Sequence, residues 1–194
     1  MKNLFKIFAV AVAAFMFTAC NNNTANEQSV NDSTAVATEQ ATPATPVFTD
    51  EGLPPVVIGA KVKDLPEAVE GLYASKKYHE IDPNLDEEEI AWDEVEGWYF
   101  YDKDGNLLFT AEDNEGAIYR IIVKSPALKT SQGTYVGMTR DEALAIEGAK
   151  LIKPDPEADY QIYTIELGKI SMTLDAENNQ KVISMEVADY SAFE

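Results

Sequence analysis

Alternation of apolar and polar residues with a period of two is the feature that most constrains the fold of this chain. In the stretch 169–174, Ile170, Met172 and Leu174 alternate with polar residues, and the stretch 181–187 continues the pattern after a turn. Successive side chains of a strand point to opposite faces, so this pattern is typical of antiparallel strands that are buried on one face.

Similar strands separated by short turns occupy both halves of the chain. Residues that favour turns, mainly Asp, Asn and Gly, cluster at 102–106, 112–116 and 175–180. Such clusters between β-prone runs predict hairpins. Each half is therefore predicted to end in a three-stranded meander, with strands at 98–101, 107–111 and 117–123 in the first half and at 160–167, 169–174 and 181–187 in the second.

A segment with the pattern of a short helix precedes each meander. In the first segment, Asp64 is suited to cap a helix, and apolar residues recur at helical spacing through 65–73. In the second, Thr139 and Glu142 form a capping-box pattern, and Gly148 is suited to end the helix.

The order of these elements predicts the fold class. We expect an α+β domain over residues 56–194, built from two helix-plus-antiparallel-meander repeats at about 56–125 and 133–188. The repeats would form one sheet with both helices on one face. The alternative is a single α+β domain whose halves match by chance.

The second helix start carries a family resemblance. The stretch Gly137-Met138-Thr139-Arg140-Asp141-Glu142, followed by a short helix and a meander, is similar to the SmpA/OmlA-like lipoproteins and to the β-lactamase-inhibitor-protein-like domains, which carry the unit in tandem. The first half reads Gly59-Ala60-Lys61-Val62-Lys63-Asp64 and departs from that motif. The resemblance implies a protein-binding or envelope-assembly module and not an enzyme.

The beginning of the chain has the pattern of an export signal, residues 1–19. Lys2 and Lys6 form a positively charged region before an apolar run, and this run, from Ile7 to Phe17, has 11 residues. A membrane-spanning helix needs about 20. A cleaved signal is therefore favoured over a permanent transmembrane helix.

The end of this signal resembles a lipobox. It reads Phe17-Thr18-Ala19-Cys20, with Phe17 where the family usually has Leu. The resemblance implies lipid, including fatty acyl chains such as palmitate, on Cys20. The alternative is ordinary cleavage that leaves Cys20, the only cysteine, as a free thiol. A lipidated Cys20 would anchor the protein to a membrane.

Residues 20–55 are interpreted as the lipidated cysteine and a disordered tether, because Asn, Thr, Ala, Gln and Ser dominate and aromatic residues are scarce. Removal of residues 1–19 leaves 13 basic and 34 acidic side chains, a net charge of −21. That charge excludes nucleic acid as an expected partner, since phosphate binding requires Lys and Arg.

Residues that could carry chemistry are few and have simpler interpretations. His79, the only histidine, is expected at the polar end of the first helix and is interpreted as a surface residue. The 102–106 stretch lacks EF-hand spacing and is interpreted as a turn. The acidic stretch 82–96 is interpreted as a solvated segment, although its carboxylates could bind a cation weakly. No catalytic residue, metal or cofactor is therefore expected.

The aromatic stretch 98–101 provides the candidate binding residues. Alternation places Trp98 and Phe100 on one face of a strand and Tyr99 and Tyr101 on the other. The tyrosine pair is expected on the exposed face, where Tyr119 or Tyr163 could join it.

The sequence therefore predicts a non-enzymatic lipoprotein of the bacterial cell envelope that binds another macromolecule, most simply a protein, through its sheet face. The location expected by analogy is the outer membrane, facing the periplasm. The alternative is a lipoprotein that binds a small ligand or a glycan with the same aromatic residues.

Replacing Cys20 by serine tests the anchor. The Cys20→Ser protein should lose membrane retention, because serine does not present the sulfur to which the lipid is attached. Cell fractionation measures this. A Cys20→Ser protein that is still cleaved, and still as membrane-bound as the wild type, would contradict the lipoprotein assignment.

Overall fold

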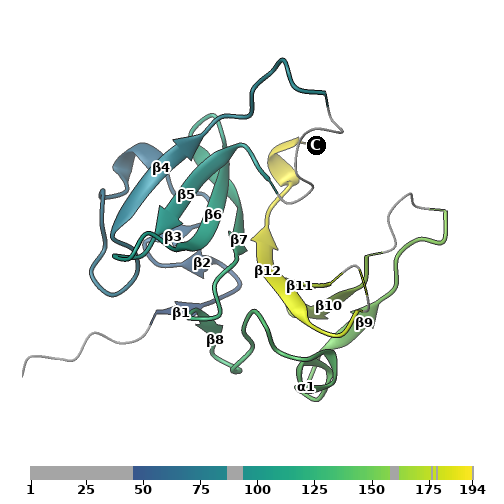
Figure 1. Ribbon diagram of the computed structural model, residues 1–194. Helices are drawn as coiled ribbons and strands as arrows, with labels where there is room; N and C mark the ends of the chain where they lie inside the picture. Colours follow the sequence, from purple (N-terminus) through teal and green to yellow (C-terminus); the bar gives the residue numbers. More distant parts are fainter. Residues whose placement is uncertain (1–45, 87–93, 158–161, 176, 178, 194) are drawn as a thin grey trace, which may run out of the picture. The chain divides into compact units, whose positions relative to one another are not determined.

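The computed structural model describes residues 46–86, 94–157, 162–175, 177 and 179–193, and these residues belong to one compact unit (Figure 1). The predicted signal, Cys20 and the tether up to residue 45 lie outside the described residues, as does the 87–93 part of the acidic segment. Within the described part, no helix has the length and apolarity needed to cross a bilayer.

The described residues are mainly β-strands. The strands are β1 (Val47–Phe48), β2 (Gly52–Leu53), β3 (Val56–Val57), β4 (Ser75–His79), β5 (Gly97–Tyr101), β6 (Leu107–Asn114), β7 (Ala117–Val123), β8 (Lys129–Thr130), β9 (Lys150–Ile152), β10 (Thr164–Leu167), β11 (Ile170–Leu174) and β12 (Val182–Ala188). The helical elements are η1 (Val62–Asp64), α1 (Arg140–Leu144) and η3 (Ser191–Phe193).

Eight strands form one antiparallel sheet in the order β4-β5-β6-β7-β12-β11-β10-β9 (Figure 1). Strands β4 to β7 make one four-stranded meander and β9 to β12 make another, and pairing of β7 with β12 joins them. Outside this sheet, β2 pairs with β3, and β1 pairs in parallel with β8.

A single register row crosses the sheet on its core side. The row is Lys76, Phe100, Phe109, Val123, Met185, Met172, Ile165 and Leu151. Its six central side chains, from Phe100 to Ile165, are 0% exposed. The period-two pattern of the sequence is thus the pattern of core contact.

Tight turns explain why the strands lie next to one another. Between β6 and β7 the two loop residues, Glu115 and Gly116, have φ values of 51° and 78°. Positive φ at both positions matches the right-handed twist of a two-residue hairpin. Glycine adopts this conformation without strain, and Asp113 supports the turn by accepting a hydrogen bond from the Gly116 amide at 2.9 Å.

The predicted helix over residues 64–73 is wrong. A short 3₁₀ turn, η1, ends at Leu65, whose φ and ψ of −75° and 136° are extended. Pro66 disfavours the helical conformation in the residue before it, and Gly71, with φ of 79°, marks a turn. Leu72 and Tyr73 are nevertheless buried. The apolar spacing therefore indicated burial correctly but not the element that provides it.

The second predicted helix forms, but it is short. In α1 the Thr139 hydroxyl accepts a hydrogen bond from the Glu142 amide, and the Glu142 side chain accepts one from the Thr139 amide at 2.9 Å. Both halves of the predicted capping box are therefore present.

The predicted α+β class, with repeats at 56–125 and 133–188 and helices on one face, is wrong. The chain is mostly β, α1 is the one α-helix among the described residues, and the sheet has eight antiparallel strands. Two of those strands, β4 and β9, were not predicted. Residues 75–79, expected to end the first helix, form β4 at one edge of the sheet.

What the halves share is a meander and the backbone bonds that brace it. The Gly59 amide donates to the Ile118 carbonyl at 2.7 Å, and the Gly137 amide donates to the Val182 carbonyl at 2.7 Å. In return, the Ile118 amide donates to the Ala60 carbonyl at 3.0 Å, and the Val182 amide donates to the Met138 carbonyl at 2.9 Å. The similarity seen in the sequence therefore corresponds to two braced meanders and not to two helices.

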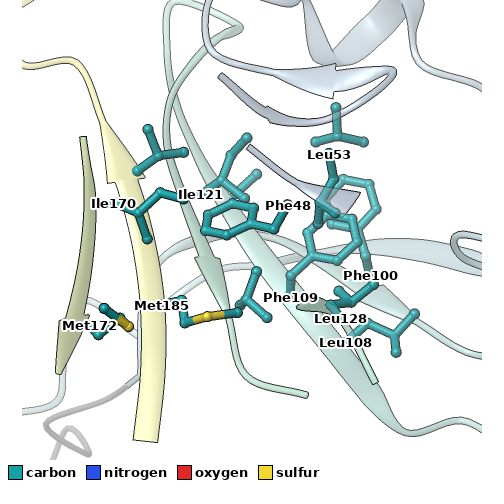
Figure 2. Close-up of a cluster of buried hydrophobic side chains, with 14 of the residues drawn as sticks. Phe48, Leu53, Phe100, Leu108, Phe109, Ile121, Leu128, Ile170, Met172 and Met185 are labelled. Atoms are coloured by element: carbon teal, nitrogen blue, oxygen red, sulfur yellow. The ribbon is translucent and has the colours of Figure 1, made fainter. Parts of the chain in front are cut away.

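The core begins earlier in the chain than predicted. Phe48 is 1% exposed and Leu53 is 0% exposed, although the tether was expected to extend to residue 55. Figure 2 shows Phe48 within the buried cluster, between Ile121 on one side and Phe109 on the other. The 47–55 segment therefore belongs to the folded unit.

Replacing Phe48 by alanine tests this boundary. Phe48→Ala should lower the free energy of unfolding by about 3–5 kcal/mol, because it removes a large buried side chain from the core. The neighbouring Val47, 41% exposed, provides the control, and Val47→Ala should cost less than about 0.5 kcal/mol. Urea denaturation measures both. Equal stability of the two variants would show that the domain starts after this strand.

Candidate interaction surface

The side of the sheet opposite the core presents a second continuous register row. The row is Lys77, Tyr99, Thr110, Ile122, Glu186, Ser171, Glu166 and Lys150. We call the surface formed by this row and its neighbours of the same facing, Tyr101, Glu112, Tyr119, Arg120, Thr173 and Ser184, the open face.

Burial varies along the open face. Lys77, Glu166 and Lys150, towards the edges of the sheet, are exposed. In the middle, Thr110 is 1% exposed and Ile122 is 5% exposed. The centre of the row is therefore closely surrounded by other side chains, whereas its ends reach solvent.

Tyr99 faces away from the core, as predicted, but its hydroxyl is engaged. The hydroxyl donates to the Val95 carbonyl at 3.0 Å and accepts from the Val95 amide at 3.2 Å. Its ring lies 5.0 Å from that of His79, which pairs with Glu94. Tyr99 is half-buried, and it fixes the 94–95 segment to the sheet.

The other predicted binding tyrosines are not brought together with Tyr99. Tyr101 is next to it on the same face, with the Lys77 ammonium 5.9 Å from the centre of its ring. Tyr119 is on β7, two strands away, and Tyr163 precedes β10, three strands further on. Tyr163 packs against the core cluster. The four tyrosines therefore do not form one cluster.

A charged network crosses the junction of the two meanders on the open face. Arg120 on β7 donates from Nη1 to Glu112 Oε1 at 2.8 Å and from Nη2 to Glu186 Oε2 at 2.7 Å. Glu112 lies on β6 and Glu186 on β12. The side chains of Arg120, Glu112 and Glu186 are 27%, 14% and 20% exposed. One arginine thus links three adjacent strands.

A bulge brings Tyr119 into this network. Glu112 pairs with Arg120 and Asp113 pairs with Ile118, so Tyr119 is the extra residue on β7. Both residues of a bulged pair can reach the same neighbour. The Tyr119 hydroxyl donates to Glu112 Oε2 at 2.6 Å, so each oxygen of that carboxylate accepts one hydrogen bond.

Electrostatics keep these groups in fixed protonation states. Burial and the hydrogen bond to Glu112 raise the pKa of Tyr119. Burial acts to lower the pKa of Arg120, but the hydrogen bond to Glu186 and the two carboxylate charges outweigh it and raise that pKa. The phenol therefore stays neutral and the guanidinium stays charged at physiological pH.

The C-terminal segment, Asp189–Phe193, lies against Tyr119. The Asp189 amide donates to the Tyr119 carbonyl at 2.7 Å. The Phe193 ring meets the Tyr119 ring edge to face at 4.9 Å, and the Tyr190 ring is 6.0 Å from it. Tyr190 and Phe193 are 53% and 57% exposed. Three aromatic rings therefore gather where the meanders meet.

Cavities of ligand size lie away from the open-face row. One of about 570 Å³ is lined mainly by apolar residues, including Val69, Leu72, Leu108 and Leu128. Two others, of about 540 and 470 Å³, share Asp50 and Lys169 in their walls. None of the four predicted binding tyrosines lines any of these three cavities.

The predicted turn at 102–106 forms, and its carboxylate is used inside it. Asp102 accepts hydrogen bonds from the amides of Asp104 and Asn106, each at 2.8 Å. Over the part of the chain that the structure describes, no group of three or more His, Cys, Asp or Glu side chains is arranged to hold a metal.

Sequence reasoning missed the charged network, although the sequence carries a signal for it. Arg120 interrupts the strand Ala117–Val123, which is otherwise nearly all apolar. A charged residue in such a strand requires a partner, because an unpaired charge is rarely tolerated there. The partner Glu186 could not be inferred, since it is 66 residues from Arg120 in the sequence and lies in the other meander.

No family model matches the chain, and no curated protein matches it. A solved structure of the uncharacterized protein yfeY from Escherichia coli matches with 14% sequence identity, covering 76% of this chain and 92% of that chain at a TM-score of 0.38. The SmpA/OmlA-like resemblance stays a prediction.

Removing the arginine tests the network. Breaking a fully buried ion pair costs about 3–5 kcal/mol. Because these side chains keep some exposure, Arg120→Ala should lower the free energy of unfolding by about 1–3 kcal/mol. The additional changes Glu112→Gln and Glu186→Gln should restore part of that loss, since they remove the unpaired charges.

Arg140, at the start of α1, provides the matched control, and Arg140→Ala should cost less than about 0.5 kcal/mol. Chemical denaturation measures the free energy of unfolding of the wild type, Arg120→Ala, the triple variant with Glu112→Gln and Glu186→Gln, and Arg140→Ala. If Arg120→Ala and Arg140→Ala are equally stable, the network does not stabilise the junction of the meanders.

Proposed function

We propose that this chain is a membrane-tethered, non-enzymatic module of the bacterial cell envelope that binds a protein partner on its open face. The observation that carries the proposal is the continuous register row across all eight strands, in which every side chain except Ile122 is polar or aromatic. A sheet built in this way presents a wide and rigid surface.

The dimensions of the row suit a protein partner. Eight strands spaced about 4.8 Å apart span roughly 34 Å, and a five-residue strand is roughly 17 Å long. These lengths give a planar area of about 580 Å² before side chains add relief. A standard protein interface buries about 800 Å² on each partner, so the open face has the right order of size.

Rigidity also supports binding of a macromolecule. The Arg120 network fixes side chains at the centre of the open face, and Tyr99 is held through its bonds to Val95. Side chains that are already ordered lose little entropy when a partner docks. The half-buried tyrosines are residue types that often contribute much of the binding energy at interfaces.

The small-ligand or glycan alternative is less well supported. It requires the predicted tyrosines to surround a cavity, whereas the three cavities described above are lined by other residues. An enzyme is also less well supported by the open face, since the carboxylates of Glu112 and Glu186 are paired with Arg120 there.

The membrane tether completes the proposal. Lipid on Cys20 would attach the chain to the outer membrane, and residues 21–45 would separate the folded unit from the bilayer. The open face would then be presented to partners in the periplasm.

Site-specific photo-crosslinking in intact cells tests the binding face. A photoreactive residue at Lys77 or Ser171, which lie on the open face in different meanders, should capture the same protein. Lys63 on η1 and Glu147 after α1 are exposed and lie near elements that pack on the core side, so probes there provide matched controls. Mass spectrometry identifies the adducts. Adducts confined to the control positions, or none from the open face, would refute the proposal.

A further inference from the structure

The C-terminal segment occupies a defined place on the open face. The Asp189 amide bonds to the Tyr119 carbonyl one step beyond the last β12–β7 register pair, Ala188 with Arg120. The segment then turns, with the Ser191 amide donating to Asp189 Oδ1 at 3.0 Å and the Phe193 amide donating to the Tyr190 carbonyl at 3.0 Å. This local structure returns the Phe193 ring to Tyr119.

We propose that Tyr119, together with Glu112, Arg120 and Glu186, forms a docking site for an aromatic-bearing peptide segment of a protein partner. We call this site the Tyr119 platform. The chain's own C-terminal segment occupies it until the partner displaces that segment. The inference rests on the proposed function of the open face and specifies the kind of partner. The segment seated there shows which chemistry fits: one backbone N–H and aromatic rings.

The attachment of the C-terminal segment is weak enough for displacement. For the described residues, its contacts with the sheet include one backbone hydrogen bond, two ring contacts and a bond of 3.3 Å from the Tyr190 hydroxyl to Glu186 Oε1. Tyr190 and Phe193 remain more than half exposed. An element with little buried surface opens locally at a small free-energy cost.

The Arg120 network also contains a hydrogen-bond donor that lacks an acceptor among the described residues. Arg120 Nε is buried and has no hydrogen-bond partner in the part of the chain that the structure describes. A buried donor without an acceptor is costly, and a carbonyl oxygen of a docked peptide can supply that acceptor.

Charge favours a neutral aromatic segment over an ionic one at this platform. Arg120 is bound by two carboxylates, so a partner's carboxylate would be repelled by Glu112 and Glu186. Three of the four oxygens of those two carboxylates already take bonds from Arg120 or Tyr119, which leaves little for a partner's ammonium group. Once the C-terminal segment is displaced, the half-buried Tyr119 ring and its backbone carbonyl are the contacts for a peptide.

Binding of the segment in trans tests this proposal without a known partner. The protein is ended after Ala188, and the acetylated peptide Asp-Tyr-Ser-Ala-Phe, the sequence of residues 189–193, is titrated against it. Amide chemical shifts of Tyr119, Arg120 and Ile121 report binding at β7. We expect saturable shifts with a Kd of about 1 mM, as suits two hydrogen bonds and two ring contacts.

Three controls make the result specific. The same peptide with alanine at both aromatic positions should bind about tenfold more weakly, as should the original peptide to a shortened protein that carries Tyr119→Ala. The full-length wild type should bind the peptide about five- to thirtyfold more weakly than the shortened protein, because its site is occupied in most molecules. Full-length protein with Tyr190→Ala and Phe193→Ala should bind the peptide, which gives a second test if the shortened chain does not fold.

The outcomes separate this proposal from the proposed function. A folded, shortened protein that shows no shift on β7, or a wild type that binds the peptide equally well, overturns the docking site. A failure of crosslinking from Lys77 and Ser171 overturns the proposed function instead, while peptide binding to the shortened protein still supports the platform.

Discussion

The pairing of β7 with β12 is the interaction on which the remaining structure depends. Each meander alone would end in an unpaired strand edge, and this pairing closes the two inner edges against each other. On the core side the paired residues include Val123 with Met185 and Ile121 with Val187, all at most 1% exposed. The pairing therefore merges two small apolar surfaces into one cluster that is large enough to stabilise a fold with little helix.

The same pairing is specified from the opposite side of the sheet. A shift of one residue along β7 would move Arg120 into the core and bring Ile121 out to the open face. Arg120 donates hydrogen bonds to Glu112 and Glu186 simultaneously, and both bonds can form only in the observed register. Ion pairs of this kind contribute modestly to net stability, but a misplaced charge in the core is very costly. The network thus acts mainly by excluding wrong pairings of the two meanders.

The sequence predicted the six inner strands of the sheet because two signals agreed there: alternation with period two and turns rich in Asp, Asn and Gly. It failed where one signal stood alone. The apolar spacing of 65–73 is compatible with a helix, but Pro66 and Gly71 prevent one. Residues 75–79 carry no alternation, since Lys76 faces the core. Its ammonium group donates to the Leu65 carbonyl at 2.7 Å at the end of η1, a partner that only the fold provides.

The candidate site shows the same limit of sequence reasoning. Alternation placed Phe100 in the core and Tyr99 opposite, and the structure agrees. It could not show that Val95 would engage Tyr99 or that Tyr163 would pack against the core, because both facts depend on how distant segments meet. The Arg120 network could not be predicted for the same reason, since Glu186 comes from the other meander.

Attachment of the C-terminal segment to the sheet has a quantitative consequence for binding. The segment follows β12 directly, so it competes for Tyr119 as an intramolecular ligand at an effective concentration that is of millimolar order or higher for a short connection. A partner therefore binds with an apparent affinity equal to its intrinsic affinity multiplied by the fraction of molecules in which the segment is open. If the closed state is favoured by about 1–2 kcal/mol, the reduction in affinity is about five- to thirtyfold. Such a factor is large enough to exclude weak, non-specific aromatic contacts and small enough for a partner that also engages the rest of the open face to overcome.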